Sequence, residues 1–263
     1  MEMPAISIKN INKTYIDQDG NEVQALHDIN LDVAEGEFVC IVGPSGCGKS
    51  TLLEIVAGLL DATGGEVTLD GQQVHGTSRD IGVVFQDASL FPWRTVRKNV
   101  AFGLEIAGVP KDEREARLKR YNSMVSLNGF ENKYPAQLSG GMRQRAGIAR
   151  TLAMNPKVIL MDEPFSAVDH LTKCTLQEEL INIRQAENKT VLFVTHDINE
   201  AVFLADRVVL LSPRPSTIQK IYEIPLEQKR GRNDPLLLKI AAEIAKDINS
   251  GGQDIPNNYW GNL

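Results

Sequence analysis

A glycine-rich loop directly after an apolar run constrains this chain more than any other feature of its sequence. The run Phe38–Val42 is typical of a strand that is buried on both faces. The residues that follow contain the pattern G-x-x-x-x-G-K-[ST], and they are Gly43, Pro44, Ser45, Gly46, Cys47, Gly48, Lys49, Ser50 and Thr51. Glycines let successive backbone amides turn inward and hold phosphate oxygens. The sequence therefore predicts a phosphate-binding loop after a central strand.

The side chains of this loop indicate which phosphate ligand it holds. Lys49 can reach the terminal phosphates of a nucleotide, and the Ser50 hydroxyl can bind a magnesium ion. The helix expected over Thr51–Leu60 directs the positive end of its dipole at the same phosphates. A glycine turn without a ligand is the alternative, but the strand before it and the helix after it favour binding. We expect ATP and Mg2+ as the ligands.

Two adjacent carboxylates end another apolar run. Val158–Met161 is followed directly by Asp162 and Glu163. Such a pair alone is common in solvated loops. On a strand neighbouring the strand of the phosphate loop, however, Asp162 would lie near the magnesium ion, and Glu163 would polarise the attacking water. The second carboxylate therefore predicts hydrolysis in addition to binding.

The remaining apolar runs predict the rest of the architecture. Continuous runs separated by helical patterns indicate a mostly parallel sheet with helices on its faces, and they are Ile81–Phe85, Val158–Met161, Val191–Val194 and Val208–Leu211. Near the amino end, apolar and polar residues alternate as in half-buried antiparallel strands, with a turn at Asp17–Asn21.

Helical patterns dominate the middle and the end of the chain. Three helices are expected in the middle, over Thr95–Ala107, Lys111–Val125 and Ser139–Met154, and one amphipathic helix is expected over Leu236–Ile248. We therefore expect a nucleotide-binding domain over 1–225, with an inserted helical subdomain at about 95–155. Residues 226–263 are expected to form a C-terminal helix and a flexible tail.

Composition excludes several classes of protein. The formal net charge of −6 argues against a nucleic-acid-binding protein, which needs a basic face. The sequence has no apolar run near the ~20 residues of a membrane-crossing helix, and the first residues lack the pattern of a signal peptide. Its three cysteines have no metal-binding spacing, which favours a reducing compartment. We expect a cytosolic protein whose membrane association comes through a partner.

The segment Leu138–Arg145, LSGGMRQR, resembles the signature motif of the ATP-binding cassette (ABC) superfamily, with Met142 where glutamine is usual. Ser139 can cap the following helix, while Gly140 and Gly141 expose its first amides. The resemblance implies an α/β P-loop NTPase fold with a mostly parallel core sheet, an antiparallel β subdomain and a helical subdomain. It also implies that the signature motif meets ATP held by a second ATPase subunit, either identical or related.

The same resemblance assigns roles to four further residues. It implies that Tyr15 stacks on adenine and that Gln86 senses the metal and the attacking water. It also implies that Asp169 contacts the opposite subunit and that His196 contacts the terminal phosphate. The expected catalytic residues are thus Glu163, His196 and Gln86, and the expected metal site comprises Ser50, Gln86 and Asp162.

The segment Asp87–Val96 favours one of three possible functions. It resembles the groove by which the ATPases of nitrate, sulfonate, taurine and bicarbonate importers receive a helix of their transmembrane permease. Phe91 and Trp93 could alternatively be core aromatics of the subdomain. A soluble cassette in iron–sulfur cluster assembly is a second possibility. A DNA-repair cassette is disfavoured by the negative charge and by the short segment between Gln86 and Leu138.

The importer interpretation implies a specific location and set of partners. ATP-driven closure and reopening of a dimer would power permease subunits, and a substrate-binding protein would act indirectly. The chain would then lie peripherally on the cytoplasmic face of the inner membrane, without a nucleic-acid partner. The sequence leaves the roles of two residues undecided. His170 has no assigned role, and Cys47 is either a small residue that fills space or a site where modification blocks nucleotide entry.

Overall fold

The structure, a computed structural model, describes residues 3–166, 168–225 and 231–250. The strands are β1 (Ile6–Ile16), β2 (Glu22–Val33), β3 (Phe38–Val42), β4 (Gly64–Leu69), β5 (Gln72–Gln73), β6 (Ile81–Val84), β7 (Val158–Asp162), β8 (Thr190–Val194), β9 (Arg207–Leu211) and β10 (Ile218–Glu223). The helices are α1 (Lys49–Val56), α2 (Val96–Ile106), α3 (Lys111–Met124), the 3-10 turn Pro135–Gln137, α4 (Gly140–Ala153), α5 (His170–Glu187), α6 (Ile198–Leu204) and α7 (Pro235–Ser250).

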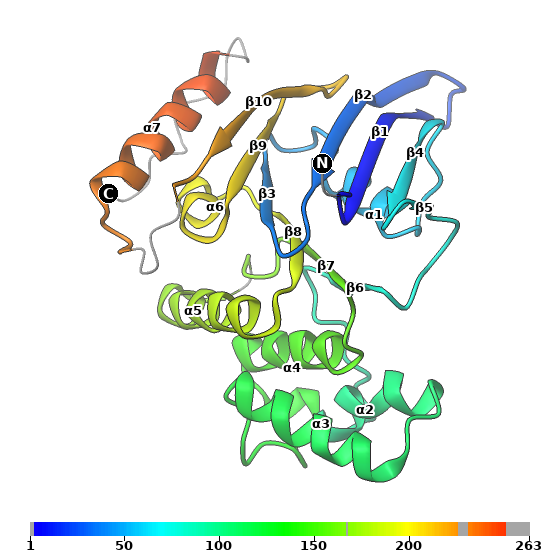
Figure 1. The fold of residues 1–263 in the computed structure, drawn as a ribbon, viewed down its shortest axis with the longest axis vertical. Coiled ribbons are helices and arrows are strands. Elements are labelled where there is room, and N and C mark those ends of the chain that lie inside the picture. Colours follow the sequence, from blue (N-terminus) through cyan, green and yellow to red (C-terminus); the bar gives the residue numbers. More distant parts are fainter. Residues whose placement is uncertain (1–2, 167, 226–230, 251–263) are drawn as a thin grey trace.

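A six-stranded sheet forms the centre of the molecule, in the order β10-β9-β3-β8-β7-β6 (Figure 1). Its strands run parallel except for β10, which pairs antiparallel with β9 at one edge. Every residue of β3 and β8 is buried, as their continuous apolar sequences predict. Because the strands are parallel, the carboxyl ends of β3, β6, β7 and β8 meet at one edge of the sheet, and the site is built there.

A second, antiparallel sheet confirms the expected β subdomain, in the order β2-β1-β4-β5. Strands β1 and β2 pair from Ile6 opposite Val33 to Ile16 opposite Glu22. The predicted turn Asp17–Asn21 connects them, and the amide of Asp17 donates to the carbonyl of Asn21 over 3.0 Å. Strands β4, β5 and β10 were not predicted. They are short or partly exposed, so their sequences lack a continuous apolar run.

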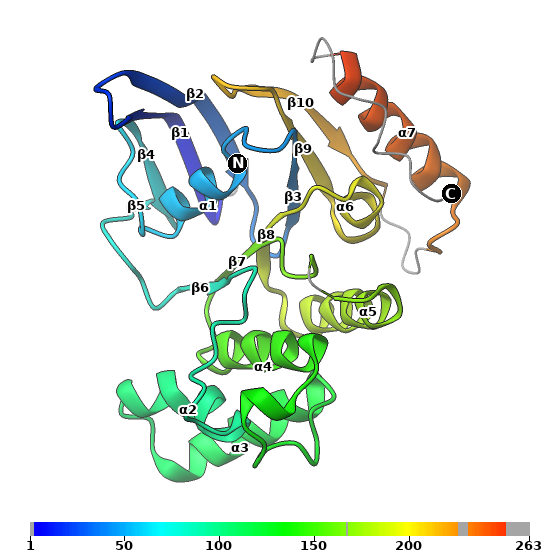
Figure 2. The same ribbon diagram turned by 180° about the vertical axis from the view of Figure 1, so that it is seen from behind.

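Helices α2, α3 and α4 gather at one end of the molecule, beyond β6 and far from β1 and β2 (Figures 1 and 2). The predicted Thr95–Ala107 and Ser139–Met154 contain α2 and α4 together with their caps. Thr95 caps α2 by accepting from the amide of Lys98, and Ser139 caps α4 by accepting from the amide of Met142. The cap residues are therefore what made these boundaries readable from sequence.

The amphipathic pattern near the carboxyl end forms α7. Its buried residues Leu237, Ala241 and Ile244 belong to the main hydrophobic core, and the helix lies beside β10 and α6 (Figure 1). The hydroxyl of Tyr222 in β10 donates to Asp247 over 2.6 Å and fixes the helix to the sheet edge. The flexible tail expected at the carboxyl end lies outside the described residues. Within the described residues, none of the helices combines the length and the apolarity that a membrane crossing requires.

Candidate nucleotide-binding site

The predicted phosphate loop joins β3 to α1 at the carboxyl edge of the sheet. Gly46 and Gly48 have left-handed φ angles of 74° and 112°, which L side chains rarely adopt. A Cβ on Gly48 would also lie 2.9 Å from Cδ2 of Leu26. The loop can therefore keep this shape only with glycine at these positions, and its amides are free of side chains that would obstruct a phosphate.

Lys49 is poised inside this loop. Its ammonium donates to the carbonyls of Gly43 over 3.0 Å and Pro44 over 3.1 Å, and the residue is buried. Neutral carbonyls are its recorded hydrogen-bond acceptors, so its positive charge remains available to an anion at the loop. This is the position from which a lysine binds the terminal phosphates of a nucleotide.

Asp162 and Ser50 meet over 3.1 Å between their Oδ1 and Oγ atoms. The sequence-based expectation that the two strands are neighbours was wrong, because β8 lies between β3 and β7. The site forms nevertheless, because α1 packs across both β7 and β8 and carries Ser50 over the intervening strand. Burial raises the pKa of Asp162, as does the charge of Glu163, against the lowering effects of Ser50 and Lys49.

Glu163 and His196 lie directly beside this pair. Oε2 of Glu163 is 2.9 Å from Nδ1 of His196. The backbone of Glu163 is in the left-handed region at a φ of 42°, and its amide donates to the carbonyl of Val194 at the end of β8. Such a conformation costs energy and persists only where the surrounding structure holds it. The two predicted catalytic side chains are thus in direct contact.

Gln86 is connected to Glu163 through Ser166, a residue to which the sequence analysis assigned no role. Its Nε2 donates to Oγ of Ser166 over 3.0 Å, and that hydroxyl donates to the carbonyl of Glu163 over 3.0 Å. Gln86 is therefore linked to Glu163, and within the described residues it makes no hydrogen bond to Ser50 or Asp162. Only the short spacing between Glu163 and Ser166 could have pointed to this link.

Tyr15 is connected to the phosphate-loop helix. Its hydroxyl lies 3.2 Å from Oγ1 of Thr51, and the residue is 39 % exposed. The ammonium of Lys13 stands 5.1 Å from the centre of the ring. An exposed aromatic ring next to the loop is suited to stacking on a base.

The signature motif and Asp169 lie apart from the phosphate loop. Ser139 caps α4, and Asp169 caps α5 by accepting from the amide of Thr172 over 3.1 Å, which lowers the pKa of Asp169. Among the described residues, no hydrogen bond joins Ser139 or Asp169 to the loop. Gly140 and Gly141 form the first turn of α4, where Gly140 is half-buried and Gly141 is buried. The single chain thus brings the loop, Asp162, Glu163 and His196 together, but not the signature motif.

A turn after β9 adds a cation that the sequence did not point to. Nη2 of Arg214 lies 3.8 Å from the point where a Cβ on Gly46 would stand. The turn is held by Ser216, whose amide donates to the carbonyl of Ala25 over 3.0 Å. Beside it, Cys47 is buried, and burial raises the pKa of its thiol. A protonated, buried thiol fits the structural role better than a reactive one.

The sequence model of the ABC transporter family matches residues 26–166, more than half of the chain. The matched segment contains the phosphate loop, Gln86, the signature motif and both carboxylates of the site. The chain belongs to the ABC transporter family. This assignment confirms the predicted fold class and the predicted ATPase class.

Curated relatives of this ABC protein extend over almost its whole length. It is 53 % identical to an uncharacterised ABC transporter ATP-binding protein of Methanocaldococcus jannaschii, covering 91 % of this chain and 89 % of the relative. It is 47 % identical to the nitrate import ATP-binding protein NrtD of Synechocystis sp., covering 92 % and 91 %. It is 42 % identical to the aliphatic sulfonates import ATP-binding protein SsuB of Bacillus cereus, covering 94 % and 97 %. The predicted resemblance to this group is confirmed.

A solved structure shows the same fold. The ABC protein superposes with a TM-score of 0.75 and 36 % identity on a dimeric ATP-binding cassette in a post-hydrolysis state with bound ADP and Pi. The match covers 84 % of this chain and all of that cassette. Cassettes of this fold therefore include a dimer, as the open signature motif of the single chain leads one to expect.

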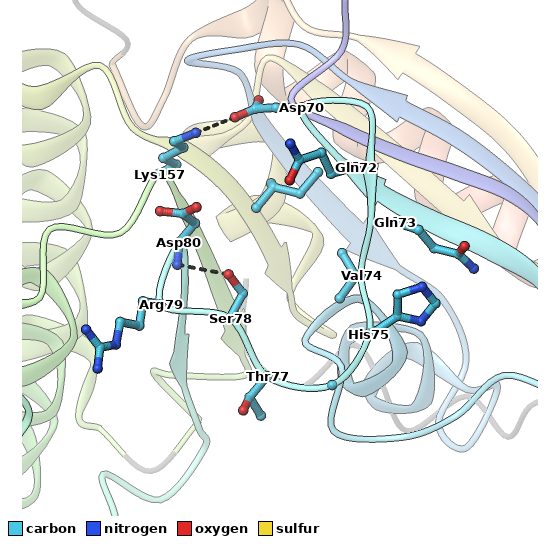
Figure 3. Close-up of a pocket in the computed structure, with 12 residues that line it drawn as sticks. Asp70, Gln72, Gln73, Val74, His75, Thr77, Ser78, Arg79, Asp80 and Lys157 are labelled. Carbon is cyan, nitrogen blue, oxygen red and sulfur yellow. Dashed lines mark hydrogen bonds and ion pairs between the residues drawn. The ribbon is translucent and has the colours of Figure 1, made fainter. Parts of the chain in front are cut away.

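A separate hollow of about 510 Å3 lies at the amino ends of β6 and β7, whereas the nucleotide site lies at their carboxyl ends (Figure 3). Its lining residues precede β6 and β7 in the chain, and they are Leu69–Asp70, Gln72–Asp80 and Lys157. In contrast, Gln86 follows β6, and Asp162 is the last residue of β7. Lys157 pairs with Asp70 across 2.5 Å at its rim. Most of its lining residues are exposed, and it is distinct from the nucleotide site.

Proposed function

We propose that this ABC protein is the ATP-hydrolysing, energy-coupling subunit of an importer for a small anion such as nitrate, a sulfonate, taurine or bicarbonate. The observation that supports hydrolysis most directly is the contact of Glu163 with His196 beside Lys49 and Asp162. The names of its relatives support the importer and the anion class.

The residues present fit a magnesium ion. The hydroxyl of Ser50 and the carboxylate of Asp162 are hard oxygen donors 3.1 Å apart, and burial raises the pKa of Asp162, so a bound cation would favour its charged form. When bound, the ion would neutralise charge on the phosphate oxygens. Lys49 and the loop amides would hold the phosphates themselves.

The remaining residues supply the chemistry of hydrolysis. Glu163 accepts a proton from the attacking water. At the same time the water oxygen forms a bond to the terminal phosphorus, and the bond from that phosphorus to the leaving ADP breaks. His196 orients Glu163 through Nδ1 and presents the rest of its exposed ring towards the terminal phosphate. Gln86 reaches this corner through Ser166. The signature motif of a second chain completes the charge stabilisation, so hydrolysis requires the dimer.

The segment that we propose as the permease contact is a hydrogen-bonded loop that carries an exposed tryptophan. Asn99, fully buried, receives the amide of Phe91 over 2.8 Å and donates to the carbonyl of Arg94 over 2.9 Å. Phe91 stacks edge-on against Phe102 at 4.5 Å between centroids, so this residue is part of the subdomain packing. Trp93 is instead 71 % exposed. A fixed, exposed tryptophan favours docking of a partner helix.

An affinity purification tests the importer role. The tagged full-length chain is expected to recover a polytopic membrane protein from gently solubilised native membranes. Trp93→Asp should lower that recovery at least several-fold, while ATP binding stays unchanged. Recovery of soluble proteins alone, with an active ATPase, would contradict the importer role.

The importer role also implies a location in the cell. We propose a peripheral position on the cytoplasmic face of the inner membrane, held by the permease, with a substrate-binding protein acting from the other side. A second copy or a related cassette would supply the opposite signature motif. Fractionation should move the chain from the membrane to the soluble fraction when the permease is deleted.

A further inference from the structure

The loop that carries His196 is held by a buried carboxylate. The hydroxyl of Thr195 donates to Oε2 of Glu200 and accepts from the amide of Asp197 over 3.0 Å. Thr195 and Glu200 are 2 % and 5 % exposed. The residues on both sides of His196 are therefore fixed through Glu200.

A lysine from α5 joins the same network. Nζ of Lys173 lies 2.6 Å from Oδ2 of Asp197 and 3.3 Å from Oε1 of Glu200. Both carboxylates contact this one ammonium, so the three groups together carry one net negative charge. A buried charge of this kind needs further hydrogen-bond donors.

Gln177 supplies one such donor, and a C-terminal residue orients it. Nε2 of Gln177 donates to Oε1 of Glu200 over 2.8 Å, and Oε1 of the same amide accepts from Nη1 of Arg232 over 2.5 Å. Arg232 also donates to the carbonyl of Cys174 over 2.9 Å and stacks on Phe203 at 4.2 Å. The guanidinium is held by several contacts, so its orientation is defined.

We propose that Arg232 is a positioning residue for ATP hydrolysis, acting through Gln177 and Glu200 on the loop of His196. This inference rests on the proposed ATPase role of His196 and Glu163. Arg232 requires the amide oxygen of Gln177 to face it, and the amide NH2 must then face Glu200. The C-terminal segment thereby becomes part of the catalytic unit.

The physical consequence of losing Arg232 follows from the side-chain amide of Gln177, which donates at one end and accepts at the other. Without the guanidinium, the amide of Gln177 loses the contact that fixes its oxygen, so its hydrogen bond to Glu200 forms for a smaller fraction of the time. Glu200 then loses a donor, and the Thr195–Asp197 segment is held less tightly. His196 would sample positions away from Glu163, and a displacement of about 1 Å at a reacting group can slow catalysis by about 100-fold.

ATPase kinetics of the full chain test this chain of contacts. Arg232→Ala is expected to lower kcat by about 10-fold with little change in the KM for ATP. Arg232→Lys should restore part of the loss, because an ammonium can still donate to the amide oxygen. Lys239→Ala is the matched control. It removes a cation of the same C-terminal segment that makes no hydrogen bond or ion pair within the described part of the chain, and kcat should not change.

A double variant separates positioning from general destabilisation. If Arg232 acts through Gln177, Gln177→Ala combined with Arg232→Ala should be no slower than Gln177→Ala alone. Losses that multiply, an unchanged kcat in a folded Arg232→Ala, or an equal loss in Lys239→Ala would overturn the inference. A wild-type chain that binds ATP without hydrolysing it would instead overturn the proposed function on which the inference rests.

Discussion

At the residue scale, the candidate site contains a strained backbone and buried charged groups, each of which lowers the free energy of unfolding. Glu163 adopts a left-handed backbone, and Asp162 has its pKa raised chiefly by burial. Lys49 is buried with carbonyls as its hydrogen-bond acceptors. Strain and uncompensated charge of this kind are typical of functional sites, where a ligand supplies the missing interaction.

Two substitutions should separate binding from hydrolysis. Glu163→Gln keeps the shape of the side chain but cannot take a proton, so it should bind ATP normally and hydrolyse it about 100-fold or more slowly. Lys49→Ala removes the cation from the loop and should abolish ATP binding. Fluorescent nucleotide titration and phosphate release measure the two properties. A Glu163→Gln variant that hydrolyses at the wild-type rate would exclude Glu163 as the base.

The raised pKa of Asp162 predicts a stability gain on neutralisation. A carboxyl whose folded pKa exceeds the unfolded value of about 3.9 retains its proton longer in the folded state. Its contribution to the free energy of unfolding therefore falls as pH rises from the unfolded pKa to the folded pKa. Asp162→Asn without nucleotide should raise Tm at pH 7 by about 1–3 °C, while losing magnesium-dependent ATP binding.

Asp197 is the control of opposite sign. Burial alone would raise its pKa, but the hydrogen bond and charge of Lys173 lower it overall. Its charged form therefore stabilises the fold above the unfolded pKa, and that stability is lost as pH falls through the folded pKa. Asp197→Asn should lower Tm at pH 7. Thermal scans in which both variants shift Tm in the same direction would contradict the electrostatic explanation.

At the element scale, the start of α4 is fitted closely against α5. A Cβ on Gly141 would lie 2.5 Å from Cγ2 of Thr172, a separation that atoms do not adopt. The same Thr172 donates its amide to Asp169 at the cap of α5. The position of the signature motif therefore depends on a methyl group of the neighbouring helix.

This contact predicts a damaging substitution and its rescue. Gly141→Ala should displace the start of α4 and lower ATPase activity by about 10-fold. Thr172→Ser removes the interfering methyl group but keeps the backbone amide at the α5 cap, so the double variant should recover most of the activity. Steady-state ATPase rates decide the matter, and an equally inactive double variant would refute the steric explanation.

At the scale of the whole molecule, one chain leaves its site open. The phosphate loop lies at the carboxyl edge of the core sheet, whereas Ser139 belongs to the helical end of the molecule (Figure 1). Under the proposed function, the groups that stabilise one phosphate therefore come from two chains. The exposed ring of His196 and the exposed start of α5 at His170 remain accessible to a partner.

The dimer should therefore form only when ATP bridges two chains. Glu163→Gln with ATP should double its mass in light scattering, and ADP should not have this effect. Adding Ser139→Arg, which fills the space at the amides of the signature motif, should keep it monomeric. A mass that is independent of nucleotide would argue against ATP as the bridge.

Local patterns were sufficient for much of the fold and for most of the site. Apolar runs indicated β3, β6, β7, β8 and β9, and helical patterns located α2, α3, α4 and α7, with polar caps at the starts of α2 and α4. The phosphate loop and the paired carboxylates were recognisable because their chemistry requires particular residues at fixed spacing. Strands β4, β5 and β10 were not predicted, because their partly exposed residues do not form a continuous apolar run.

The sequence by itself thus determined which segments are buried and where the glycine-rich loop lies, since burial, capping and loop composition are local properties. Only the tertiary structure decided that β8 separates β3 from β7, that His196 meets Glu163, and that Arg232 reaches Gln177. These relations join residues far apart in the chain. They depend on how the strands order and the helices pack, which no local pattern of residues records.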